Sequence, residues 1–248
     1  MTGLGLIAFL LGLVIGSFVT AVAHRVPRGM SIVGPRSICP TCGAQIAAHD
    51  NVPVFSWVVL RGRARCCGAS IAPRYPLTEL VVGILFAATV LVYRGDAAEV
   101  AIGLVFVTML VAVTLTDLER RIIPNKILIV GAVACVALAL PTDPGGMPER
   151  LIAAVAAGGL LFCVALAYPG GMGLGDVKLI AVMGLFLGRA VAPAFLIALL
   201  TGSLVGLALL ARHGSGARKM AIPFGPFLAF GGVVAMLVGN QLIDLYLS

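Results

Sequence analysis

The stretch VAVTLTDLERRIIPN (residues 111–125) marks the point where one long apolar segment ends and the next begins. The segment that it ends, residues 98–116, has the length and composition of a membrane-spanning helix, which needs about 20 apolar residues. Asp117 follows directly, where a charge costs about 2.5–3.5 kcal/mol to insert unless it pairs, faces water or takes part in chemistry. This stretch therefore predicts a membrane helix that ends at an acidic residue, and that residue pairs, faces water or takes part in chemistry.

The composition of the whole chain also indicates a membrane protein. Hydrophobic residues make up 60% of the 248 residues and charged residues 11%, whereas a soluble domain carries about 25% charged residues. The chain is too apolar to remain disordered. Its six cysteines are too few over this length for a small secreted disulfide protein. The sequence therefore predicts an all-α polytopic membrane protein.

Eight apolar segments predict about eight transmembrane helices. They cover residues 3–23, 77–93, 98–116, 122–140, 150–168, 177–190, 191–211 and 226–246. Only Gly188, Arg189 and Pro193 divide the sixth segment from the seventh. The one long polar stretch predicts three regions. These are a first helix at 1–24, a small cysteine-containing domain of turns and short strands at 25–76, and a seven-helix core at 77–248.

The net charge of +7 does not indicate nucleic-acid binding, because the basic residues lie between the apolar segments. If the loops after the first, third, fifth and seventh segments are cytoplasmic, they hold fourteen of the 17 basic residues. This is the asymmetry that the positive-inside rule describes. The sequence thus predicts a multi-pass protein of the cytoplasmic (inner) membrane, embedded in the lipid bilayer, with the long loop inside and both termini outside.

A second acidic residue, Asp176, begins the sixth segment within GGMGLGDVKL (residues 170–179). In the predicted topology it lies on the same side as Asp117, so the two carboxylates can meet at the inner edge of the bilayer. Two close carboxylates share a proton, and such a pair activates water in aspartic peptidases. Glycines allow a peptide strand to approach closely. Here they are Gly170, Gly171, Gly173 and Gly175.

The two aspartates also admit other interpretations. In one, each aspartate only pairs with a basic neighbour, which is Arg120, Arg121 or Lys178. In another, acidic residues beside glycine-rich helix breaks mark the ion path of a transporter or channel. Transporters more often contain an internal repeat, and this sequence has none.

The loop after the first segment carries two pairs of cysteines. Cys39 and Cys42 form a CPTC motif, and Cys66 and Cys67 follow in ARCCG. Thiolates are good zinc ligands, and a loop without its own core gains stability from a metal. However, adjacent cysteines fit a tetrahedral ion poorly, and Ala64 occupies the position where a second CxxC would begin. A reduced, metal-free loop or a disulfide is the alternative.

Two further polar residues near this loop are ambiguous. His49 is another possible metal ligand, although a lone histidine in a loop is usually solvated. Glu79 begins the second apolar segment beside Arg74 and Tyr75. It is either a charge that stabilises a helix N-terminus or a functional group.

Taken in order, these motifs resemble the type IV prepilin peptidases, which are membrane aspartic peptidases of the GxGD class. The resemblance covers almost the whole chain, and six motifs in the family's order are more specific than any single one. The matching stretches are GSFVTAVAHRVPRG (16–29), CPTCG (39–43), NVPVFSWVVLRGRARCCGASIAPRYPLTEL (51–80), TDLERRIIPN (116–125), GMGLGDVKL (171–179) and IPFGPFLAFGG (222–232).

The resemblance implies that Asp117 and Asp176 are the catalytic pair, and that Gly173, Gly175 and Lys178 belong to a flexible substrate loop. It implies that the enzyme cuts a short basic leader from a type IV prepilin or pseudopilin, after a glycine, at the cytoplasmic face of the membrane. No metal is expected for peptide cleavage.

The resemblance also implies N-methylation of the new N-terminus with S-adenosylmethionine, an activity that the family associates with the cysteine-bearing loop and its zinc site. The candidate residues are Gly62 and Glu79 for methyl transfer and Cys39, Cys42, Cys66 and Cys67 for zinc. Ala64, in place of a third motif cysteine, and Thr20, in place of a frequent asparagine, depart from the family's pattern. Neither departure affects the aspartates, whose presence argues against a methyltransferase that has lost cleavage.

Overall fold

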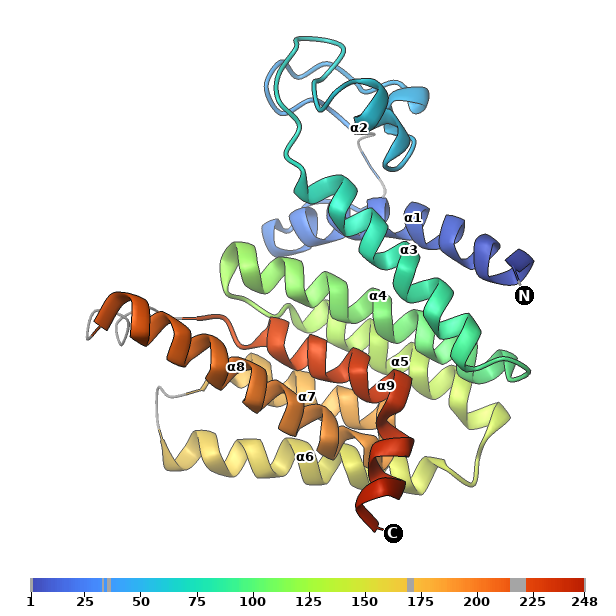
Figure 1. Ribbon diagram of the computed structural model, residues 1–248, viewed down its shortest axis with the longest axis vertical. Coiled ribbons are helices and arrows are strands. Elements are labelled where there is room, and N and C mark those ends of the chain that lie inside the picture. Colours follow the sequence, from blue (N-terminus) through green and yellow to red (C-terminus); the bar gives the residue numbers. More distant parts are fainter. Residues whose placement is uncertain (1, 33, 35–36, 169–171, 215–221, 248) are drawn as a thin grey trace. The chain divides into compact units, whose positions relative to one another are not determined.

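The computed structural model describes residues 2–32, 34, 37–168, 172–214 and 222–247. Within these residues all regular structure is helical, apart from two isolated β-bridges. A helix covers each of the eight predicted apolar segments (Figure 1), which confirms the all-α prediction. The helices are α1 (Thr2–Arg25), α3 (Arg74–Val92), α4 (Ala97–Arg120), α5 (Asn125–Thr142), α6 (Met147–Ala167), α7 (Leu174–Leu187), α8 (Val191–His213) and α9 (Gly225–Leu247).

Six stretches of the described chain are long and apolar enough to cross a membrane. Five correspond to α1, α3, α4, α5 and α6, and the sixth is the 40-residue stretch Leu174–His213, which contains both α7 and α8. A short 3-10 turn, η3 (Gly188–Ala190), interrupts that stretch at the predicted boundary between the sixth and seventh segments. Because α7 has only 14 residues, the number of eight membrane crossings stays a prediction.

The chain forms two compact units, residues 1–95 and 96–248. The first contains α1, α3 and the segment between them, residues 26–73, which we call the cysteine loop. The second contains α4 to α9. The three-region division that we draw from the sequence stays a prediction.

In the first unit, α1 and α3 pack together through glycines. A Cβ atom at Gly12 would lie 2.7 Å from the Cα atom of Gly83, and one at Gly16 would lie 2.7 Å from the Cα atom of Glu79. Larger residues would separate the helices, so the glycines allow the close backbone approach that is typical of membrane helix pairs. This packing holds Glu79 firmly at the end of α3 that adjoins the cysteine loop.

The cysteine loop contains short helices where the sequence predicts turns and short strands. These are η1 (Val26–Arg28), η2 (Ala48–Asn51) and α2 (Phe55–Val59). In the described part of the loop, strand pairing is limited to two single bridges, Ile38 with Gln45 and Arg63 with Ser70. Each bridge closes a tight turn around one cysteine pair and leaves no length for a ladder, so the prediction of strands is wrong.

In the second unit, α6 and α7 also pack through small residues. A Cβ atom at Gly184 would lie 2.6 Å from the Cα atom of Ala154, and one at Gly158 would lie 2.7 Å from the Cβ atom of Ala181. Along the chain, α5 returns from the end of α4 and α6 returns from the end of α5. The C-terminal end of α4 and the N-terminal end of α7 therefore lie at the same end of this unit.

A similar contact between α8 and α9 gives a test of the packing. A Cβ atom at Gly231 would overlap the carbonyl oxygen of Ala194. We expect Gly231→Ala to lower the free energy of unfolding by about 1–3 kcal/mol, the usual cost of overpacking, and thermal unfolding of the purified protein measures this. At Gly206 on α8 an added Cβ would meet no atom within 4 Å. The control variant Gly206→Ala should keep the wild-type Tm, and an equal loss in both variants would contradict the prediction.

Candidate active site

Asp117 lies in the last turn of α4, and its side chain is buried. The carboxylate oxygen Oδ2 accepts a hydrogen bond of 2.9 Å from the backbone N–H of Gly225. Gly225 is the first residue of α9, and the first N–H groups of a helix have no partner within the helix. The start of α9 therefore orients Asp117 with a donor that the helix itself does not use.

Asp176 lies half-buried in the first turn of α7, where the helix dipole favours a carboxylate. The neighbouring glycines leave room around it. A Cβ atom at Gly173 would lie 3.3 Å from Oδ2 of Asp176, and one at Gly175 would lie 3.1 Å from the Cβ atom of Ile123. The GLGD sequence thus allows this acidic turn to lie close against the connection between α4 and α5.

Asp117 and Asp176 lie at the same end of the second unit, near enough for the charge of Asp117 to act on Asp176. In the described residues, neither Asp117 nor Asp176 forms an ion pair with a basic side chain. Arg121 acts on Asp117 only through space, and Lys178 donates instead to Oδ1 of Asn125, at 3.2 Å. The interpretation in which each aspartate only neutralises a basic neighbour is therefore not supported.

Gly225 is a site residue that the sequence analysis does not connect with the aspartates. Its stretch, IPFGPFLAFGG, shows only that a long helix starts there. A helix start is a general site for negative charge, but the sequence does not show which acidic residue lies against it. Gly170 and Gly171, which the sequence analysis includes near Asp176, lie outside the described residues.

Two interacting carboxylates at one end of an apolar helix unit have the chemistry for hydrolysis. When they share a proton, one can accept a proton from water while the other donates one to a carbonyl oxygen. The hydrogen bond from Gly225 occupies one oxygen of Asp117. The carboxylate is therefore held in one orientation, as acid–base catalysis requires.

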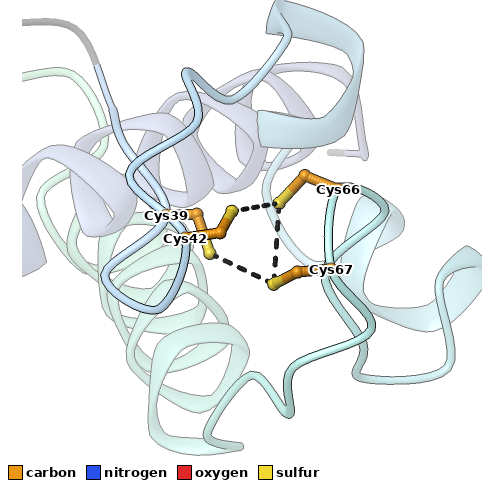
Figure 2. Close-up of side chains that lie close together, drawn as sticks. All are labelled: Cys39, Cys42, Cys66 and Cys67. Carbon is orange, nitrogen blue, oxygen red and sulfur yellow. Dashed lines mark hydrogen bonds between the residues drawn. The ribbon is translucent and has the colours of Figure 1, made fainter.

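A second cluster lies in the cysteine loop, where four sulfur atoms face one another (Figure 2). The sulfurs of Cys39, Cys42, Cys66 and Cys67 all lie within 4.8 Å of one another, and His49 lies outside the cluster. Three pairs are 3.4, 3.7 and 3.9 Å apart, and all four residues are free thiols. Sulfurs bound at about 2.3 Å to a tetrahedral zinc ion are about 3.8 Å apart. The donor set therefore fits a structural zinc ion.

The two cysteine pairs lie on turns with the same backbone hydrogen bonds. In the first turn, the N–H of Cys39 donates to the carbonyl oxygen of Ala44 at 2.8 Å. The N–H of Gly43 donates to the carbonyl oxygen of Cys39 at 2.9 Å. In the second turn, Ala64 and Gly68 make the same two bonds at 2.8 and 2.7 Å. Both glycines have φ near +70°. Ala64 is thus the structural counterpart of Cys39, and Cys66 supplies the fourth sulfur from a new position.

The protonation of the thiols follows from their local contacts. The backbone N–H groups of Cys42 and Thr41 point to the sulfur of Cys39 and lower the pKa of this thiol to about 6. Hydrogen bonding to Cys42 raises the pKa of the Cys66 thiol to about 12. Backbone donors directed at sulfur favour the thiolate, the form that binds metal, so the first turn is already arranged to act as a ligand.

Gly62 and Glu79, the two residues predicted for methyl transfer, both support the cysteine loop. Gly62 has a φ of +69° and lies against the indole of Trp57, where a Cβ atom would be 3.1 Å from the ring. Glu79 is buried, and its carboxylate accepts the N–H of Val54 at 2.7 Å and also bonds to Ser17. Val54 has a φ of 60°, which is costly for a branched residue. Glu79 therefore ties the loop to α3 at a strained position.

Comparison with known proteins then decides the family. Residues 10–93 match the Bacterial Peptidase A24 N-terminal domain, and residues 104–211 match the Type IV leader peptidase family. A protein of Bacillus subtilis (strain 168) named prepilin leader peptidase/N-methyltransferase is 35% identical over 98% of this chain and 97% of that protein. The chain belongs to the type IV leader peptidase family.

Other leader peptidases with the same name agree with this assignment. The protein of Myxococcus xanthus (strain DK1622) is 39% identical over 83% of this chain and 63% of that protein. The protein of Aeromonas hydrophila is 32% identical over 98% of this chain and 93% of that protein. No solved structure matches the chain. The comparisons confirm the resemblance to prepilin peptidases, and with it a multi-pass membrane peptidase. They do not favour a transporter or channel.

The contact between Gly225 and Asp117 gives a test of the site. A Cβ atom at Gly225 would lie 2.7 Å from Oδ2 of Asp117, so Gly225→Ala should displace the carboxylate. A displacement of about 1 Å can cost roughly 100-fold in rate, and we expect a loss of this order in leader peptide cleavage. The initial rate of conversion of a prepilin on a gel measures it. Gly206→Ala is the matched control, and wild-type cleavage by Gly225→Ala would show that this contact is not needed.

Proposed function

We propose that the chain removes the leader peptide of type IV prepilins or pseudopilins at the cytoplasmic face of the membrane, with Asp117 and Asp176 as the catalytic pair. One observation carries the assignment of residues. Carboxylates from α4 and α7 interact at one end of the apolar helices, and in the part of the chain that the structure describes neither is neutralised by an ion pair. The names of the relatives support the substrate class.

The proposed mechanism uses the two carboxylates as an acid–base pair. They share one proton, because two such groups at short range do not both ionise easily. A water molecule held between them attacks the carbonyl carbon of the scissile bond. The ionised carboxylate takes a proton from this water while the protonated one donates to the carbonyl oxygen. When the tetrahedral intermediate breaks down, one carboxyl group donates its proton to the leaving amine while the other carboxylate takes a proton from a hydroxyl group of the intermediate, so the pair again holds one proton.

We infer a topology with eight crossings of the cytoplasmic membrane, the cysteine loop inside and both termini outside. The asymmetry of the basic residues supports this orientation, and the path of α4 to α7 is consistent with both aspartates at the inner edge of the bilayer. In this arrangement the apolar helix of the prepilin lies in the lipid beside the enzyme. Its basic leader reaches the cytoplasmic side, where the aspartates can act on it.

We infer that the chain also methylates the N-terminus that cleavage exposes, as the name of the relatives indicates for them, with S-adenosylmethionine as the donor. Gly62 and Glu79 do not fit as contacts to this donor, because Trp57 covers the glycine and Val54 and Ser17 occupy the carboxylate. Any influence of these two residues on methyl transfer would pass through the shape of the cysteine loop.

We propose that Cys39, Cys42, Cys66 and Cys67 hold a structural zinc ion, and that Cys66 replaces the thiol missing at Ala64. The short sulfur separations support this set of ligands. The ion would join the two cysteine turns, and a small loop without its own core gains stability from such a link. It has no part in peptide cleavage.

Replacement of either aspartate tests the peptidase assignment. We expect Asp117→Asn and Asp176→Asn each to lower cleavage by at least roughly 1,000-fold, because an amide cannot take a proton from water. Intact-mass measurement of a co-expressed prepilin reports the loss of the leader and the gain of one methyl group in the same spectrum. Asp143 is exposed at the end of α5, so Asp143→Asn is the control. Complete processing by either active-site variant would contradict the mechanism.

The position of the fourth zinc ligand is tested by moving the thiol. We expect Cys66→Ala to lose bound zinc, and Ala64→Cys combined with Cys66→Ala to regain it, because the backbone of the second turn already matches that of the first. Elemental analysis of the purified proteins gives the zinc content. Cys163 is an exposed thiol on α6, and Cys163→Ala should keep the metal. Full zinc content in Cys66→Ala would exclude Cys66 as a ligand.

A further inference from the structure

A partly buried arginine at the far end of the second unit contacts both helices that carry the aspartates. Arg150 lies in the first turn of α6, and its side chain is 11% exposed. Its Nη2 binds Oε1 of Glu99, in the first turn of α4, at 2.5 Å. Its Nη1 donates to the carbonyl oxygens of Phe186, at 2.7 Å, and Leu185, at 3.4 Å, in the last turn of α7. One guanidinium thus joins α4, α6 and α7.

This contact satisfies groups that the end of α7 leaves open. The last four carbonyls of a helix have no N–H partner within it, and in apolar surroundings each unpaired group costs several kcal/mol. Gly188, with a φ of +54°, ends the helix and returns its N–H to the carbonyl of Gly184. The guanidinium takes the next two carbonyls, and a cation at a helix C-terminus also interacts favourably with the helix dipole.

We call the contacts of Arg150 with Glu99 and with the end of α7 the junction. Neighbouring contacts strengthen it. Oε1 of Glu149, the residue before Arg150, accepts the backbone N–H of Arg189 at 3.1 Å. Phe106 of α4 stacks on Phe186 of α7, with ring centroids 4.7 Å apart. The ends of α4, α6 and α7 that lie away from the aspartates are therefore held together by charge, hydrogen bonds and a ring contact.

The junction controls the axial position of the helices. A helix rises about 1.5 Å per residue, so the junction lies roughly 27 Å along α4 from Asp117 and roughly 15 Å along α7 from Asp176. A helix is stiff along its axis, so a shift of α7 at one end moves Asp176 at the other. The contact between α6 and α7 uses small residues such as Gly158 and Gly184, which allow close approach but present little side chain to resist sliding.

We propose that Arg150 is a positioning residue for peptide cleavage, because it fixes α7 against α4 and thereby sets the separation of Asp117 and Asp176. This inference rests on the proposed function of the two aspartates. It requires arginine, since the planar guanidinium carries its donors on separate nitrogens, of which Nη2 binds the carboxylate and Nη1 binds the two carbonyls. A lysine at this position keeps the charge but not the set of contacts.

The test compares the full-length variants Arg150→Lys and Arg150→Gln with Arg189→Gln. Arg189 is exposed at the same end of the unit and contacts Glu149 through its backbone N–H. Arg189→Gln therefore removes one positive charge there and keeps that N–H, which makes it a matched control. In steady-state assays with a prepilin in detergent, we expect both Arg150 variants to lower kcat by roughly tenfold or more while KM stays within about twofold. Arg189→Gln should behave as the wild type.

The pH profile of kcat separates positioning from a general effect on folding. Two interacting carboxylates titrate in two steps, and the difference between their two apparent pKa values becomes larger as the carboxylates come closer. A looser junction should therefore reduce this difference in Arg150→Gln. The charged neighbours of the pair, Arg121 and Lys178, are the same in every variant. A residue that only supports folding would reduce the amount of active enzyme and its Tm but would leave the pH profile unchanged.

The outcomes are distinguishable. An unchanged pH profile, an equal loss in Arg189→Gln, or wild-type kinetics in both Arg150 variants would overturn the positioning role. Asp117→Asn in the same assay reports on the proposed function: if it still cleaves, that function is wrong, and if it is inactive while the Arg150 variants are normal, only the positioning role fails. If Arg150→Gln does not fold, Glu99→Gln, which keeps an acceptor of the same shape, should show the narrowed profile instead.

Discussion

A carboxylate at the end of an apolar helix unit needs polar partners, and in this protein the free backbone groups of helix ends provide them. Asp117 is oriented by an N–H group at the start of α9, and Asp176 lies in the first turn of α7. At the other end of α7, carbonyl groups bind the guanidinium of Arg150. Helix ends carry four unpaired groups each, so the places where helices start and stop determine where charge can be kept within apolar surroundings. The site is therefore defined by helix boundaries as much as by its acidic residues.

The parts of this arrangement that depend on local sequence could be predicted. The length of the apolar segments predicted each of the eight long helices. The position of Asp117 and Asp176 at the ends of such segments made them candidate site residues. The sequence could not reveal that Gly225 contacts Asp117, because the two residues lie far apart in the chain and only packing brings α9 to the end of α4. It could not reveal the role of Arg150 for the same reason, since a basic residue between two apolar segments suggests only topology. The short helices of the cysteine loop escaped prediction because prolines and glycines there suggest turns without specifying their type.

The two units hold different groups of candidate residues. The matches to the two family domains, at 10–93 and 104–211, fall within the two compact units. Both aspartates and the arginine junction lie in the second unit, whereas the four cysteines, Gly62 and Glu79 lie in the first. The contacts that hold the cysteine loop, from Glu79 to Val54 and from Trp57 to Gly62, are internal to the first unit. Changes in that loop therefore act first on contacts within the first unit.

The paired turns of the cysteine loop also bear on how such sites are recognised across related proteins. Ala64 and Gly68 reproduce the hydrogen bonds of Cys39 and Gly43 although one thiol has been replaced, and a sulfur two positions further along faces the other three. The second turn thus has the backbone shape of the first although it begins with alanine instead of cysteine. A search that demands CxxC twice would discard this chain, although its four sulfur atoms lie within the separations that a tetrahedral metal ion allows. A criterion based on the turn itself, with its glycine at positive φ, would retain them.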